Sequence, residues 1–218
     1  MPPFTRTLEI KTRANALPKA TSLLLSFEKI QGLATDQAKV CWKVVKFPAN
    51  QEMSVSITFS SQLCFIHSQV NSGNVISAAT AKDVHDGEQT KLVVDKDSGV
   101  AMFTNPTPDP SVGAEMIRCQ NKTGAISALA VGTRDTPDGD PNPVMFFENI
   151  PDDSGVLVKF TPILLAYVTS NYVSNEIIRG EVDSAEILRQ DLKALSEKTT
   201  WHLEWDSTTG KSSLVKSA

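Results

Sequence analysis

The sequence matches itself at a spacing of about 100 residues, and this internal repeat constrains the fold more than any other feature. The clearest block pairs six residues with six others at a constant spacing of 101 and without a gap: Val55, Ile57, Phe59, Leu63, Asn74 and Ile76 with Val156, Val158, Phe160, Leu164, Asn175 and Ile177. An earlier block, which includes Leu23 and Leu25, matches Leu129 and Val131 at a spacing of 106. A later block matches at 111, since Leu92, Asp95 and Gly99 correspond to Leu203, Asp206 and Gly210. A unit of this length is too long for a solenoid repeat and suits a small domain, so the pattern predicts two copies of one domain.

Strict alternation of apolar and small polar residues identifies the strands. The segment Met53-Ser-Val-Ser-Ile-Thr-Phe-Ser places its apolar side chains on one face and its polar side chains on the other, because successive residues of a strand point in opposite directions. Residues 4–11, 40–45 and 201–206 show the same alternation. One apolar face and one polar face are typical of antiparallel sheets that pack on one side.

Turn signals such as Asp97-Ser-Gly and Thr208-Thr-Gly separate these runs and leave room for about seven short strands in each copy, as in a β-sandwich. The fold class that we predict is therefore all-β, with two tandem antiparallel β-sandwich repeats. Residues 1–104 form the first repeat, and residues 114–218 form the second. Residues 105–113 form the linker, because three prolines in this stretch prevent a central strand from running through it.

One segment of the second repeat has a helical pattern. Asp183-Ser-Ala-Glu resembles a capping box, and Leu188, Leu192 and Leu195 follow at the spacing of an apolar helix face. The pattern predicts one short helix over 183–195. Residues 17–30 fit a helix or a strand, and the match of Leu23 and Leu25 to the second repeat favours a strand.

Charge and hydropathy exclude some classes of protein. The net charge of −4 argues against nucleic-acid binding, which requires a basic surface. We expect no membrane span, because no apolar run approaches the length of about 18 residues that a span requires. The first residues show no apolar run of the signal-peptide type, so we expect the protein to be cytoplasmic, or secreted without a visible signal peptide. Cys41, Cys64 and Cys119 have no partners in the repeat and are expected to be buried free thiols, with a Cys41–Cys64 bridge as the alternative.

Two clusters could hold a metal ion, although no cofactor is required. His202, Glu204 and Asp206 alternate along one strand and share its polar face, where a nitrogen and two carboxylates could bind a transition metal. Asp135, Asp138 and Asp140 lie in one loop with the oxygen-rich composition that calcium prefers. The alternatives are an ordinary polar strand face and an ordinary turn.

No motif points to covalent catalysis, since the chain has no G-x-S-x-G elbow and no phosphate-binding glycine loop. His67 follows apolar residues and suits a core position better than a catalytic one. The combination of Tyr172 with Asn171 and Asn175 is suited to a sugar, because tyrosine offers a ring for stacking and the amides offer hydrogen bonds to hydroxyls. The alternative is that Tyr167 packs in the core and Tyr172 caps it.

The stretches Leu164-Leu-Ala-Tyr-Val-Thr-Ser-Asn-Tyr and Thr199-Thr-Trp-His-Leu-Glu-Trp-Asp resemble a group of uncharacterised two-repeat β-sandwich proteins from mushroom-forming fungi. The resemblance extends through most of the chain and is most specific in the second repeat. It implies a fungal setting in which small β-sandwich lectins are common, and it carries over no site residue.

We therefore expect a non-enzymatic β-sandwich binding protein that is lectin-like, with carbohydrates or a glycosylated surface as its partners. Two copies of a site on one chain would add avidity. One alternative is an enzyme with its site in the groove between the repeats. Another is a structural or self-assembling protein, a homo-oligomer whose exposed strand edges pair with other chains.

Overall fold

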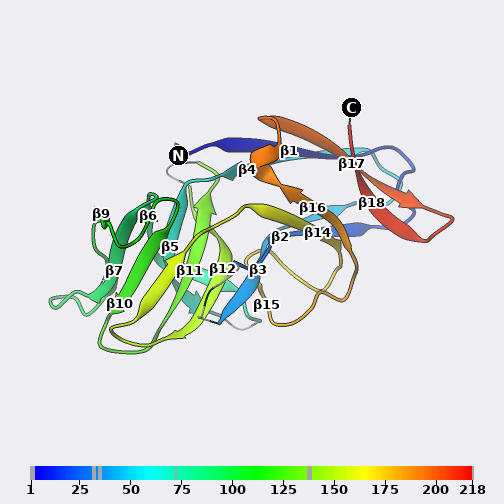
Figure 1. The fold of residues 1–218 in the computed structure, drawn as a ribbon. Coiled ribbons are helices and arrows are strands. Elements are labelled where there is room, and N and C mark those ends of the chain that lie inside the picture. Colours follow the sequence, from blue (N-terminus) through cyan, green and yellow to red (C-terminus); the bar gives the residue numbers. More distant parts are fainter. Residues whose placement is uncertain (1–2, 31–32, 34–35, 72, 137–138, 218) are drawn as a thin grey trace.

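The computed structural model describes residues 3–30, 33, 36–71, 73–136 and 139–217. The first half of the chain supplies nine strands to the part that is described: β1 (Thr5–Thr12), β2 (Thr21–Phe27), β3 (Gln37–Phe47), β4 (Met53–Ser60), β5 (Leu63–Val70), β6 (Ile76–Val84), β7 (Glu88–Val94), β8 (Ala101–Phe103) and β9 (Thr107–Pro108). The second half supplies β10 (Ile117–Lys122), β11 (Ser127–Arg134), β12 (Pro141–Ile150), β13 (Gly155–Val158), β14 (Ile163–Val168), β15 (Ile177–Ile178), β16 (Glu186–Asp191), the 3-10 helix η1 (Leu192–Ala194), β17 (Lys198–Asp206) and β18 (Lys211–Lys216). The prediction of an all-β fold is confirmed (Figure 1).

The strands form one long sheet and two short sheets. The long sheet has the order β16-β14-β2-β3-β12-β11-β5-β6, and β15 pairs with β3. One short sheet has the order β18-β17-β1-β4, and the other has the order β13-β10-β7-β8, with β9 paired to β7. The pairs are antiparallel as predicted, except that β1 pairs with β17 and β7 pairs with β10 in parallel.

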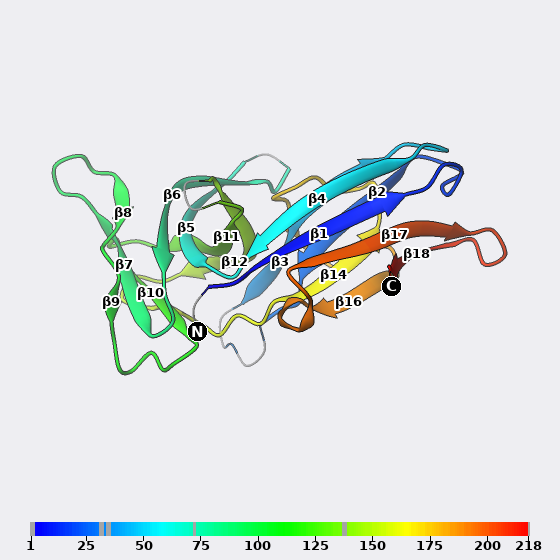
Figure 2. The ribbon, with the colours of Figure 1, turned by 90° about the horizontal axis from the view of Figure 1, so that it is seen from above.

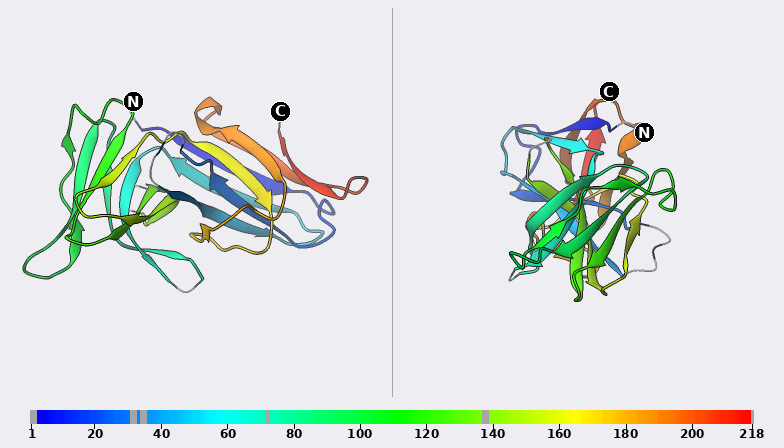
Figure 3. Two further views of the ribbon diagram at one scale, coloured as in Figure 1. Left: turned by 60° about the horizontal axis from the view of Figure 1, so that its bottom comes forward. Right: turned by 90° about the vertical axis from the view of Figure 1, so that its left-hand side faces the viewer.

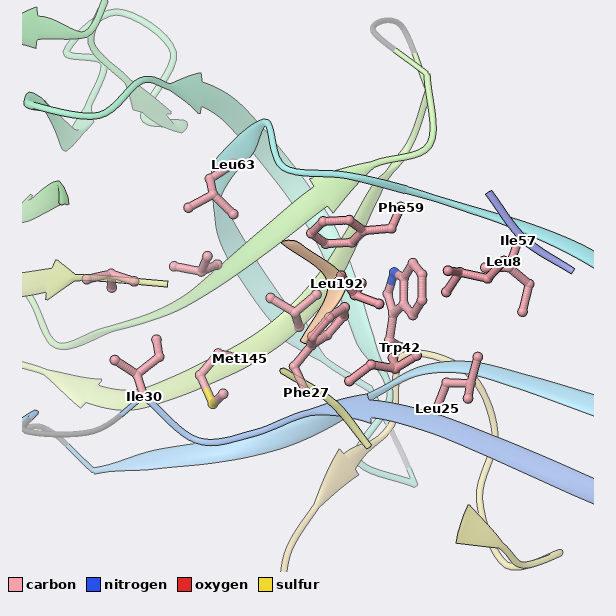
Figure 4. Packing of buried hydrophobic residues seen from close by; sticks show 14 of the residues in the cluster. Leu8, Leu25, Phe27, Ile30, Trp42, Ile57, Phe59, Leu63, Met145 and Leu192 are labelled. Carbon is pink, nitrogen blue, oxygen red and sulfur yellow. The ribbon is translucent and has the colours of Figure 1, made fainter. Parts of the chain in front are cut away.

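Both short sheets pack against the same face of the long sheet, which gives a sandwich layout (Figure 2). One continuous cluster of buried side chains fills the space between the layers and includes residues of all three sheets. At its centre the rings of Phe27 and Trp42 lie 5.2 Å apart, and Phe59 of β4 packs 5.5 Å from Phe27 (Figure 4). The alternation along residues 53–60 therefore has the expected result, because Ile57 and Phe59 face this core.

The strands of the two halves occupy equivalent places in the sheets. In the short sheets β1, β4, β17 and β18 correspond to β10, β13, β7 and β8, in the same order. In one short sheet Leu8 faces Ile57, and in the other Ile117 faces Val158. The hairpin of β7 and β8 and the hairpin of β17 and β18 have turns of the same kind, in which a hydroxyl donates to an aspartate three residues earlier. The two hairpins project from opposite ends of the molecule (Figure 3). The long sheet is likewise symmetric about the pairing of β3 with β12. The two halves of the chain therefore share one strand order.

The two halves do not, however, fold into separate sandwiches. Strand β1 pairs with β17 of the second half, and β10 of the second half pairs with β7 of the first. Each short sheet therefore contains strands from residues 1–104 and from residues 114–218. The proline-rich stretch 105–113 is not a free linker either, because β9 pairs with β7 and Val112 is buried.

The helix predicted over 183–195 is wrong. The segment contains strand β16, which pairs with the edge of β14, and only the short 3-10 helix η1 follows it. Asp183 accepts hydrogen bonds from Thr169 and Asn171 instead of capping a helix. The open edge of β14 offers backbone hydrogen bonds that the local helical pattern does not outweigh. Leu192 is nevertheless fully buried.

Residues 17–30, which fit either structure, contain strand β2, as the match between the repeats predicts. No helix in the part of the chain that the structure describes is long and apolar enough to cross a membrane.

Candidate functional site

A groove with a volume of about 820 Å³ lies on the outer face of the long sheet, opposite the short sheets. Buried or half-buried apolar and aromatic side chains line its floor: Ala38, Phe146, Leu165, Tyr167, Ile178 and Val182. Charged side chains border it: Glu28, Lys29, Asp36, Lys39, Glu148, Arg179, Glu181 and Glu186. Such a volume, with an apolar floor and a few polar groups, is typical of small-molecule sites.

Alternation places these residues on the outer face. Leu23 and Leu25 of β2 point into the core, so Leu24 between them points outward. In the same way Leu164 and Ala166 of β14 face the core, and Tyr167 faces outward. We call the resulting patch the outer cluster, formed by Leu24, Cys41, Leu165, Tyr167 and Ile178.

Lys39 and Tyr167 meet on the floor of the groove. Lys39 lies near the middle of the long sheet, where β3 pairs with both β12 and β15. Its Nζ donates a long hydrogen bond of 3.4 Å to Tyr167 Oη and lies 5.3 Å from the centre of the Tyr167 ring. Burial lowers the pKa of the Lys39 ammonium, and the charge of Lys29 lowers it further. Burial also raises the pKa of the Tyr167 hydroxyl, with a further contribution from Glu186.

Ion pairs fix part of the groove's border. Arg179 binds Glu148 across the groove and also donates a 3.3 Å hydrogen bond to Asn74 Oδ1. The hydrogen bond from Arg179 lowers the pKa of the Glu148 carboxyl. Glu28 pairs with Arg189 at 2.5 Å. The border carries five carboxylates and three cationic groups, so its charge is negative overall.

The groove floor is not repeated in the other half of the molecule. The position equivalent to Lys39 in the other half is Pro141, and the position equivalent to Tyr167 is Ile66. The duplicated topology therefore does not provide two equal sites, and the avidity argument loses its structural basis.

The three residues predicted to bind a sugar lie beside this groove but do not line it. Tyr172 comes after the end of β14 and packs, half-buried, against the outer cluster. The Asn171 side chain is exposed and donates a hydrogen bond to Asp183. Asn175 contributes its backbone to the meeting point of the two halves, and its Oδ1 is buried without a hydrogen-bond partner.

The structure does not group the first predicted metal cluster, His202, Glu204 and Asp206, into a metal site. Glu204 lies 3.7 Å from Arg13, and Asp206 accepts hydrogen bonds from Thr208 and Thr209 within its own turn. His202 is half-buried, and its Nδ1 has no hydrogen-bond partner among the described residues. In the described part of the chain, no three His, Cys, Asp or Glu residues are grouped to hold a metal ion.

In the other predicted metal site a lysine occupies the position expected for a cation. Lys43 Nζ lies 2.9 Å from Asp135 Oδ2 and 2.8 Å from Asn142 Oδ1. Asp140 accepts a hydrogen bond from Asn142 through its backbone carbonyl. Asp138 lies outside the described residues.

The cysteines and the other two histidines lie outside the groove around Lys39 and Tyr167. The three cysteines are free and buried, as predicted, and burial raises the pKa of each thiol to about 12. His67 is half-buried on β5, and desolvation lowers the pKa of its imidazole. His85 is exposed in a loop.

A second groove, of about 350 Å³, lies where the two halves meet beside β1 and β4. Three of its charged side chains, Arg6, Glu115 and Lys159, are already engaged. Arg6 stacks 4.5 Å above Phe4 and donates to the carbonyl of Leu192, and Lys159 pairs with Glu115 at 2.8 Å. The groove predicted between the repeats therefore exists, but it is the smaller of the two, and its half-buried cationic group, Arg6, is engaged by Phe4 and by the Leu192 carbonyl.

Lys39 is the site residue that sequence reasoning missed. Its burial depends on β14 and on the segment around β15, which lie more than 120 residues away in the chain. Tyr167 was recognised, but only as a core residue. Comparisons with protein-family models, curated proteins and solved structures find no match for this chain.

Proposed function

We propose that the protein is a non-enzymatic, lectin-like binding protein that takes a carbohydrate in the groove above Lys39 and Tyr167. The observation that carries this proposal is the combination of an apolar, aromatic floor with a closely spaced ring of polar groups. A sugar presents CH faces and hydroxyls in the same molecule, so such a site can satisfy both.

Several groups can form hydrogen bonds to sugar hydroxyls. Glu181 and Glu186 are exposed and can accept, and Arg179 can donate. The Gln37 side chain is less available, because it forms two hydrogen bonds with the backbone of Ile30. These bonds tie Gln37, the first residue of β3, to Ile30.

A glycan array followed by titration calorimetry tests the proposal. We expect Arg179→Ala and Glu148→Ala each to weaken binding about ten-fold or more, because a hydrogen bond to a charged group contributes about 1.5–3 kcal/mol. Both side chains lie at the protein surface, so the fold should be preserved. Lys46→Ala, an exposed residue of the same strand as Lys39, is the control and should bind as the wild type does.

The same titration distinguishes binding in the groove from binding at Asn171, Tyr172 and Asn175, the residues predicted from the sequence. If a bound glycan lies on Tyr172 instead, Tyr172→Ala weakens binding and Arg179→Ala does not. If the wild-type protein binds no glycan on the array, the lectin-like function is wrong.

A further inference from the structure

Among the described residues, the Lys39 amine forms no ion pair with a carboxylate. Its Nζ donates a hydrogen bond to the Tyr167 hydroxyl and lies over the Tyr167 ring. The other lysine of this groove, Lys29, is exposed. A half-buried ammonium with no ion-pair partner loses hydration without full compensation, which favours its neutral form. The lowered pKa of Lys39 agrees with this geometry.

The border of the groove makes an anionic ligand for Lys39 unfavourable. Five carboxylates lie around it and only two other cationic groups, Lys29 and Arg179. Glu148 is paired with Arg179 and Glu28 with Arg189, and Asp36, Glu181 and Glu186 are the other three carboxylates. Glu181 and Glu186 line the same groove and would repel an anion. Their charges raise the pKa of Lys39, but the opposite effect of burial is larger, so the pKa is lowered. A neutral ligand meets no such repulsion. A neutral ligand that uses the lone pair of the amine is an electrophile, and the common one in sugars is the carbonyl group.

We propose that Lys39 forms a reversible imine with a small aldehyde held in the groove, such as the open-chain form of a reducing sugar. This inference rests on the same groove as the proposed function and names a chemistry for it. Imine formation by a desolvated lysine is an established mode of covalent binding.

The step balances within the groove. The Lys39 lone pair attacks the carbonyl carbon, a C–N bond forms, and the carbonyl π pair moves to oxygen, which takes the Tyr167 hydroxyl proton. The carbinolamine then expels its hydroxyl group, which leaves as water with a proton from nitrogen, and the C=N bond forms. Tyr167 recovers its proton from the nitrogen through this exchange. The net change is one amine and one aldehyde giving one imine and one water, with no oxidant or reductant.

Tyr167 is placed to carry this proton. Its Oη lies 3.4 Å from Lys39 Nζ, and burial keeps the hydroxyl protonated by raising its pKa. Its ring packs in the outer cluster, so the hydroxyl cannot turn far from the amine. At the corresponding place in the other half, Ile66 and Pro141 offer neither the amine nor the hydroxyl.

Reductive trapping tests the proposal on the full chain. The folded protein is incubated with glycolaldehyde and sodium cyanoborohydride, digested, and the modified lysines are quantified by mass spectrometry over time. We expect Lys39 to be modified several-fold faster than Lys29, because a larger fraction of its amine is neutral at neutral pH. In a denaturant this preference should vanish, and this comparison requires no variant.

Variants then test the roles of the Tyr167 hydroxyl and the Lys39 amine. Tyr167→Phe should slow the modification of Lys39 and leave that of Lys29 unchanged, which a merely structural change would not do. Lys39→Arg should remove the fast site while circular dichroism shows the same fold. Modification of Lys39 no faster than Lys29 in the folded wild type would overturn the proposal. Fast modification without glycan binding would refute the lectin-like function alone, and glycan binding without fast modification would refute the imine alone.

Discussion

Val75 and Glu176 form an isolated antiparallel bridge where the two halves of the chain meet on the outer face of the long sheet. Around this bridge the amide of Ile76 donates to the carbonyl of Asn175, and the amide of Ile177 donates to the carbonyl of Asn74, each at 2.9 Å. The two hydrogen bonds are equivalent, because Ile76 and Asn74 of the first half correspond to Ile177 and Asn175 of the second. Asn74 and Asn175 both have left-handed backbones, with φ angles of 60° and 66°.

The first prediction concerns this left-handed position. Asn175→Ala should have a free energy of unfolding about 1–2 kcal/mol lower than that of Asn175→Gly, because a Cβ is unfavourable at positive φ. Asn175→Gly should be close to neutral, since glycine adopts positive φ freely and the buried Oδ1 has no partner to lose. Urea denaturation measures both variants. Equal stability of the two variants would show that the backbone conformation is not the cause.

The second prediction follows from the exchanged strands. Residues 1–104 and residues 105–218, expressed separately, should not form folded monomers, because β1 would lose β17 and β10 would lose β7. Each fragment should be unfolded or should pair with a second copy of itself, and mixing the two should restore a complex of one of each. Size-exclusion chromatography and circular dichroism measure this. A cooperatively folded monomer of either half would contradict the exchange.

The third prediction uses a close approach of two backbones. A Cβ on Gly155 would lie 2.2 Å from the carbonyl oxygen of Cys119, on the neighbouring strand β10. Gly155→Ala should therefore destabilise the protein by about 1–3 kcal/mol, because the backbone must shift to make room. Gly180→Ala is the matched control, since nothing lies within 4 Å of its added Cβ and it does not require positive φ. Thermal unfolding should show a lower melting temperature for the first variant alone.

The fourth prediction concerns pH and the two hairpin turns. Hydrogen bonds from Ser98 and the Asp97 amide lower the pKa of Asp95, and those from Thr209 and the Thr208 amide lower the pKa of Asp206, both from 3.8. A carboxyl whose folded-state pKa is lowered stabilises the fold above its unfolded-state pKa, and this contribution is lost as the pH falls through the folded-state value.

The Asp95→Asn and Asp206→Asn double variant should therefore be less stable than the wild type at neutral pH. Its stability should also fall less between about pH 5 and about pH 2. Urea denaturation across this range measures the difference. Parallel pH profiles for the two proteins would mean that these carboxylates do not take part.

The helix over 183–195 shows why some predictions from local patterns fail. Leu188, Leu192 and Leu195 have helical spacing, but the free edge of β14 lies beside them and β16 pairs with it. Leu192 is buried in spite of the wrong element, because the apolar residue still turns to the core. Tyr172 shows the same limit for a site, since its half-buried position depends on Leu165 and Ile178, which the local sequence does not reveal.

The sequence by itself determined the all-β class, the core-facing residues Ile57 and Phe59, and the buried state of the three cysteines. These depend on alternation and on side-chain hydrophobicity, which act over a few residues. Only the tertiary structure decided that β1 pairs with β17 and that Lys39 meets Tyr167 in a groove. Both depend on which distant strand completes an open sheet edge. The two halves of this chain share one strand order and so offer two similar strands for each edge, and the packing of the whole molecule selects between them.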